Sequence, residues 1–79
     1  MDTTELVKHI AETITEGEVK VECTPDRRGA ILKLHPTQNI PILIGKRGQT
    51  IDALRVIARA LGYNGKHGVQ IIVNEQKNT

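Results

Sequence analysis

The sequence predicts an α+β fold in which a three-stranded mixed sheet is covered on one side by three helices. Apolar residues recur at helical spacing in residues 3–16 and 50–61, and they alternate with polar residues in 18–24 and 30–35. A last apolar segment, residues 69–73, follows the second long helix. Because that helix is a long crossover, the last strand can pair parallel to the second. With one short helix before the crossover, the predicted order is α-β-β-α-α-β.

The first predicted helix, residues 3–16, has clear signals at both ends. Asp2 or Thr3 can accept hydrogen bonds from its first turn, and Gly17 suits the left-handed position after its last turn. We expect one face to be buried. The apolar residues on that face are Leu6, Val7, Ile10 and Ile14.

The two strands that follow are predicted to form an antiparallel hairpin. Pro25 to Gly29 is a turn sequence, and Pro36 ends the second strand because proline donates no hydrogen bond to a ladder. Alternate side chains of both strands should face the helices. They are Val19, Val21, Cys23, Ala30, Leu32 and Leu34.

Residues 40–44 are predicted to form a short helix, with Asn39 as its cap and Pro41 in its first turn. The long helix over 50–61 should end at Gly62. One apolar face of that helix is expected to be buried. Its residues are Ile51, Leu54, Ile57, Ala58 and Leu61.

The 79 residues predict one domain, residues 1–79, with an ordered core over about 3–74 and a frayed tail over 75–79. A single cysteine, Cys23, excludes an internal disulfide, and no apolar stretch resembles a leader or a membrane span. We therefore expect a cytoplasmic protein without a membrane partner.

The charges are unevenly distributed along the chain. Residues 1–26 contain two basic and seven acidic side chains, whereas residues 27–79 contain nine basic and two acidic ones. This asymmetry predicts one face that attracts polyanions. Tyr63 is the only aromatic residue, so base stacking on several exposed rings, as in RRM domains and many OB-folds, is excluded.

The most informative segment is Gly45-Lys46-Arg47-Gly48, between the short apolar helix and the long one. Two glycines three apart allow a tight turn with close backbone approach, and two cations between them favour an anion. The start of the following helix adds free N–H groups and a positive dipole end. A plain turn between helices would need neither feature. The segment therefore predicts binding of the phosphates of a single-stranded nucleic acid.

With its flanking residues, Ile40 to Ile44 before it and Gln49 to Leu54 after it, this segment resembles the Gly-x-x-Gly signature of a K-homology (KH) domain. The element order resembles the type II KH fold, and the chain is similar to small bacterial single-KH RNA-binding proteins. The resemblance implies a loop that grips about four nucleotides and an aliphatic groove for the bases. The predicted RNA-binding residues are Ile44, Gly45, Lys46, Arg47, Gly48, Gln49, Thr50, Ile51, Leu54 and Arg55.

The groove is expected to have an aliphatic floor and a cationic rim. Arg55 is a candidate for the rim, and Pro41 departs from the family pattern by standing in the helix that enters the loop. The candidates for the floor are Ile42, Ile44, Ile51 and Leu54, with Leu32 and Leu34 opposite, and those for flanking loops are Arg27, Arg28 and Lys66.

The sequence thus predicts a single-stranded RNA binder, and the resemblance implies an RNA chaperone or post-transcriptional regulator. So short a footprint should bind in about the micromolar range or more weakly, which favours a homodimer or a second KH-containing partner. Binding of single-stranded DNA is one alternative. A protein-interaction module, docking through the acidic first helix and strand, is another.

Catalysis and cofactor binding are not predicted. His9, His35 and His67 lie far apart in sequence, no cysteine pair is present, and Lys46 is not followed by the Ser or Thr of a nucleotide-binding loop. We expect no enzymatic activity, no metal, no cofactor and no small-molecule substrate.

Overall fold

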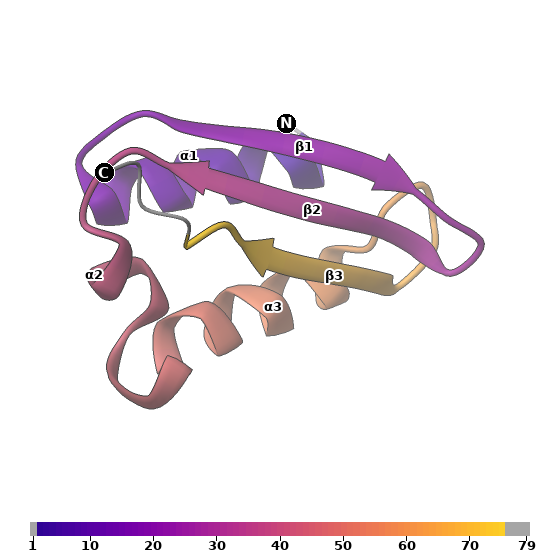
Figure 1. Cartoon of the computed structure of the whole chain (residues 1–79). Helices are drawn as coiled ribbons and strands as arrows, with labels where there is room; N and C mark the ends of the chain where they lie inside the picture. The colour runs from indigo at the N-terminus through magenta and orange to yellow at the C-terminus, as the bar shows by residue number, and fades with distance from the viewer. Residues whose placement is uncertain (1, 76–79) are drawn as a thin grey trace.

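The computed structural model describes residues 2–75 and confirms the predicted α+β class and element order (Figure 1). A single turn of 3-10 helix, η1, is added between the last two helices. The elements are α1 (Thr3–Thr15), β1 (Val19–Pro25), β2 (Gly29–Pro36), α2 (Ile40–Ile44), η1 (Lys46–Gly48), α3 (Gln49–Leu61) and β3 (Gly68–Val73).

The sheet is mixed, as predicted, with the strand order β1-β2-β3. β1 and β2 form an antiparallel hairpin in which Cys23 lies opposite Leu32, and Leu32 lies beside Ile71 in the parallel pair β2–β3. The β1–β2 turn is fixed by Asp26, whose carboxylate accepts hydrogen bonds from the backbone N–H groups of Arg28 and Gly29 at 2.8 and 2.9 Å. β3 is an edge strand of the sheet, and α3 lies beside it (Figure 1).

The core lies between one face of the sheet and the helices. α1 packs on β1 and β2, α3 packs on β3, and α2 packs mainly against the other two helices. Thr15 is buried with the core and donates its hydroxyl to the carbonyl of Ala11 at 2.9 Å. The buried apolar residues are Val7, Ala11, Val19, Ala30, Leu32, Leu34, Leu43, Ile51, Leu54, Ala58, Val69 and Ile71.

The burial predicted for α3 is wrong at two positions. Ile57 is 42% exposed and Leu61 is 53% exposed, whereas Ile51, Leu54 and Ala58 are buried as predicted. At 100° per residue, Ile57 lies at the border of the apolar stripe, and Leu61 is the last residue of α3. α3 therefore keeps apolar surface exposed at this border and at its end.

The contact between the end of α1 and the start of α2 positions the short helix, and its details differ from the prediction. Glu16, not Gly17, takes the left-handed conformation after α1, with φ of 55°. Asn39 stands at the start of α2, but its side chain donates to the Thr15 carbonyl at 2.7 Å instead of capping α2. The Gln38 amide donates to the Glu16 carbonyl at 2.9 Å. The carbonyls at the end of α1 therefore hold the start of α2.

Cys23 and Tyr63 link β1 to the segment after α3. A hydrogen bond with the Cys23 side chain is the main cause that raises the pKa of Tyr63, whose ring packs against the core. This contact lies at the end of α3 opposite the glycine loop, because Tyr63 follows α3 and Gly48 precedes it. Cys23 is half-buried and packs against the core from β1, on the face predicted for it.

The hydrogen bonding between β2 and β3 continues one residue past the end of β3. The Asn74 N–H donates to the Leu34 carbonyl at 2.8 Å, which places Glu75 at the end of the sheet. Of the tail predicted over 75–79, only Glu75 belongs to the described residues, and the remainder lies outside them.

Leu32→Ala should lower the free energy of unfolding by about 2–5 kcal/mol, because it empties space at the centre of the core where the side chain is fully buried. The exposed neighbour provides the control, since Lys33→Ala should change stability by no more than about 0.5 kcal/mol. Urea unfolding followed by circular dichroism measures both. Equal losses for the two variants would contradict the position of the core.

Candidate nucleic-acid interface

The loop between α2 and α3 reverses the chain within four residues. The Gly45 N–H donates to the Pro41 carbonyl at 2.9 Å and ends α2, and the Gly48 N–H donates to the Gly45 carbonyl at 3.1 Å. The Gln49 N–H then bonds to the Lys46 carbonyl as α3 begins. The loop is therefore held by its own backbone hydrogen bonds, between two helices that are anchored in the core.

The two glycines are needed for different reasons. Gly45 has φ of 80° and ψ of 172°, a backbone conformation available essentially to glycine alone, and a Cβ there would lie 2.8 Å from the Thr50 backbone nitrogen. Gly48 has φ of 75° and ψ of 15° in the left-handed region, and the nearest atom to an added Cβ is 4.0 Å away. Gly45 is required by conformation and space, and Gly48 by conformation alone.

Lys46 and Arg47 are both exposed at the tip of the loop. Arg47 has φ of 56°, which costs a non-glycine residue about 1–2 kcal/mol. No sequence signal marks this strain, because arginine is not a residue that favours the left-handed region. The fold thus holds a cation in a strained position at the point where the loop meets solvent.

The first turn of α3 adds to the positive potential of the loop. No side chain accepts a hydrogen bond at the Gly48 cap, and Gln49 is exposed. The N–H groups of a first helical turn and the helix dipole favour an anion within about one turn. Lys46, Arg47 and the start of α3 therefore act on the same volume of solvent.

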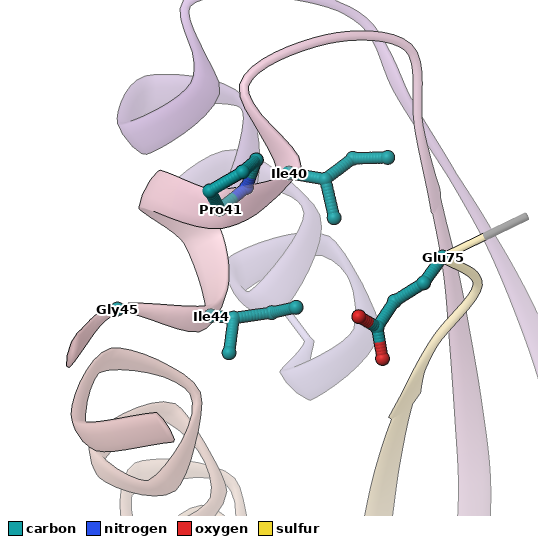
Figure 2. Close-up of a pocket in the computed structure, with 5 residues that line it drawn as sticks. All are labelled: Ile40, Pro41, Ile44, Gly45 and Glu75. Carbon is teal, nitrogen blue, oxygen red and sulfur yellow. The ribbon is translucent and has the colours of Figure 1, made fainter. Parts of the chain in front are cut away.

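A hollow of about 370 Å³ lies beside the loop, between α2 and the end of β3 (Figure 2). The side chains of Ile40 and Ile44 extend from α2 towards the strand end, and the Glu75 carboxylate reaches back towards Ile44. Sequence reasoning missed Glu75 by assigning it to a frayed tail. The lining residues are Ile40, Pro41, Ile44, Gly45 and Glu75.

The residues predicted for the aliphatic floor and its opposite wall differ in how much surface they expose. Ile44 lines the hollow and Ile42 is 56% exposed on α2, so both have surface to offer. Leu32 and Leu34 have no exposed surface and cannot form an opposite wall, which corrects the prediction. Ile51 and Leu54 are 4% and 2% exposed. Both side chains belong to the core, and their predicted contact with RNA stays a prediction.

Arg55 is committed to two partners within the protein. Its Nε and Nη2 donate to the Ile71 carbonyl at 3.3 and 3.2 Å, and its Nη1 donates to Asp52 Oδ1 at 2.7 Å. The side chain therefore joins α3 to the edge strand β3. The predicted role of Arg55 at the rim of the groove stays a prediction, with most of the donors of this side chain already engaged.

The cations predicted in flanking loops lie elsewhere. Arg27 and Arg28 belong to the β1–β2 turn, and Lys66 belongs to the turn that follows α3 (Figure 1). The Gly68 N–H donates to the Arg28 carbonyl at 2.8 Å, so both turns meet at the start of β3. The 13 residues of α3 separate this end from the glycine loop. The element order alone places Lys66 after α3, whereas the place of Arg27 and Arg28 follows from the pairing of β2 with β3.

Two of the three histidines, His35 and His67, have separate side-chain partners. His35 Nε2 lies 2.5 Å from Glu22 Oε1, and His67 Nδ1 lies 2.8 Å from the Arg59 carbonyl oxygen. Within residues 2–75, no group of three or more His, Cys, Asp or Glu side chains could hold a metal ion. Over the same residues, no helix is long and apolar enough to cross a bilayer.

The sequence model of the family described as "KhpA/KhpB, KH domain" matches residues 4–74, from α1 to the end of β3. The chain belongs to this KH-domain family. Comparison with curated proteins and with solved structures gives no match. Membership confirms the resemblance to small bacterial single-KH proteins and makes the chain a nucleic-acid-binding KH protein. KH domains are binding modules and are not typically enzymes.

Gly45→Ala should destabilise the KH domain by about 3 kcal/mol, since the new Cβ combines a glycine-only conformation with a clash at Thr50. Gly48→Ala should cost only about 1 kcal/mol, because the left-handed region is strained but space is free. Thermal unfolding gives the two losses, and amide chemical shifts around Thr50 should move more for Gly45→Ala. A larger loss for Gly48→Ala would contradict the loop geometry.

Proposed function

We propose that this KH protein binds single-stranded RNA, with the Gly45–Gly48 loop against the sugar-phosphate chain of about four nucleotides. The observation that carries the proposal is the adjacency of an exposed cationic glycine loop and an apolar hollow. Gly45 belongs to both, because it begins the loop and lines the hollow. A nucleotide has two matching parts, an anionic phosphate and a flat base whose faces are apolar.

The phosphate side of the interaction is electrostatic. Lys46 and Arg47 neutralise phosphates, and the first turn of α3 offers N–H donors to the same strand. The absence of a Cβ at the two glycines lets the RNA backbone approach the loop closely. These contacts position the strand and give affinity without reading its sequence.

The base side requires unpaired nucleotides. Ile40, Pro41 and Ile44 offer aliphatic surface in a hollow, and a base reaches such a surface only when it is turned out of a duplex. Single-stranded DNA offers the same phosphates and nearly the same bases. The proposal commits to RNA on the family match, and a DNA oligomer of equal sequence tests the choice directly.

Lys46→Asp with Arg47→Asp should abolish most RNA binding and make the salt dependence shallower by about 1–2 units of slope, since each phosphate contact on a single strand contributes about 0.7. Fluorescence anisotropy with labelled RNA and DNA heptamers, at several salt concentrations, gives both quantities.

The control for this variant is Lys8→Asp with Lys20→Asp, which changes the net charge equally at exposed positions on α1 and β1. It should keep most of the affinity. Equal losses in both double variants would mean that net charge, rather than the loop, drives binding. Full binding by the loop variant would favour a protein-interaction module instead.

A single KH domain with so short a footprint binds weakly, so we propose that it acts as a homodimer or with a second KH-containing protein. α3 provides the surface for such a contact. Val56 is 63% exposed, and with Ile57 and Leu61 it gives α3 three exposed large apolar side chains. The two RNA sites of a dimer would act on one strand in the cytoplasm, in the manner of an RNA chaperone or post-transcriptional regulator.

Val56→Asp should shift the protein towards the monomer and weaken binding to a long RNA more than binding to a heptamer, because it places a charge in the proposed contact. Sedimentation velocity and anisotropy measure these effects. Ile72→Asp is the matched control, since Ile72 is another apolar side chain, 45% exposed, on β3. If both variants become monomers, or if neither does, α3 is not the contact surface.

A further inference from the structure

We propose that Glu75 selects the base that enters the hollow, and that the favoured base is guanine. This inference rests on the proposed RNA binding and adds a sequence preference to it. Four of the lining residues offer aliphatic side chains or a glycine backbone, and Glu75 is the charged one among them. Among these lining residues, Glu75 is therefore the one whose side chain can form hydrogen bonds.

The position of Glu75 is built into the sheet. Val73 pairs with Leu34 in the parallel ladder, and the next residue, Asn74, donates its N–H to the Leu34 carbonyl at 2.8 Å. Glu75 follows directly on this anchored backbone. Figure 2 shows its carboxylate directed across the hollow towards Ile44 of α2. A base that lies on Ile40 and Ile44 would present its edge to the carboxylate.

The chemistry of the carboxylate decides which edge fits. An ionised carboxylate only accepts hydrogen bonds, and its two oxygens match two parallel N–H donors. Guanine presents such a pair, N1–H and N2–H, on its Watson–Crick edge. Adenine and cytosine each present one amino group beside a ring nitrogen acceptor, and uracil presents one N–H between two carbonyls. Guanine gains most from Glu75, and uracil is opposed by its carbonyl oxygens.

The charge environment supports a role for Glu75 in selection. Residues 27–79 contain only two acidic side chains, Asp52 and Glu75. Asp52 is paired with Arg55 at 2.7 Å, and neither ion pair found within residues 2–75 includes Glu75. A carboxylate beside a phosphate-binding loop weakens the binding of every nucleic acid. Only a base with matching donors offsets this repulsion, so the residue creates a difference between bases.

The test compares guanine with inosine, which lacks only the N2 amino group. Labelled heptamers of uridine carry guanosine, inosine, adenosine or uridine at the central position, and anisotropy gives their affinities. The wild-type protein should bind the guanosine heptamer about tenfold more tightly than the inosine heptamer, as expected for one hydrogen bond to a charged acceptor. In Glu75→Gln this ratio should fall to about one to threefold, since the amide offers one acceptor oxygen.

The matched control is Glu5→Gln, which removes one exposed carboxylate from the start of α1. It should raise the affinity for all heptamers slightly and leave the guanosine preference unchanged. A wild-type protein that binds all heptamers alike, or a Glu75→Gln variant that keeps the full preference, overturns the inference and leaves RNA binding intact. A wild-type protein that binds none of them, nor longer RNA, overturns the proposed function and this inference together.

Discussion

The backbone conformation of Gly45 is the constraint on which the site depends. Its φ of 80° and ψ of 172° end α2 and direct the chain into a turn so short that α3 begins four residues later. Both flanking helices are fixed independently, α2 by buried Leu43 and α3 by buried Ile51. The loop cannot relax without moving one of them. Because the loop is already ordered, a ligand does not have to pay for ordering it, and that preorganisation favours affinity.

The fold separates its charges so that the loop remains available for a ligand. Asp52 and Arg55 neutralise each other on α3 and hold the edge of β3 through the Ile71 carbonyl. The cations of the β1–β2 turn lie at the opposite end of α3 from the loop (Figure 1). Lys46 and Arg47 remain exposed beside the uncapped start of α3. The positive potential near the hollow therefore comes mainly from these two residues and the helix end.

Sequence was sufficient for the order, the pairing and the loop, because periodicity and the Gly-x-x-Gly spacing are local signals. It failed wherever a property depends on which segments meet in space. The exposure of Ile57 depends on which segments pack against the border of the α3 apolar stripe, and the place of Arg28 depends on which end of α3 the β1–β2 turn reaches. Asn39 is a residue type that often caps helices, yet its side chain donates to the Thr15 carbonyl instead. Glu75 lines the hollow because β3 pairs parallel to β2. No residue near Glu75 in the sequence indicates that position.

The loop and the hollow can contribute separately to binding. Contacts to phosphates give nearly the same free energy for any sequence, so Lys46 and Arg47 set affinity but not preference. Preference requires a polar group at the base edge, and among the residues that line the hollow only Glu75 supplies a charged one. Its charge opposes the phosphates that the loop attracts. A weak, salt-sensitive grip is therefore compatible with discrimination between bases, because the same carboxylate lowers the affinity for strands that it cannot bond.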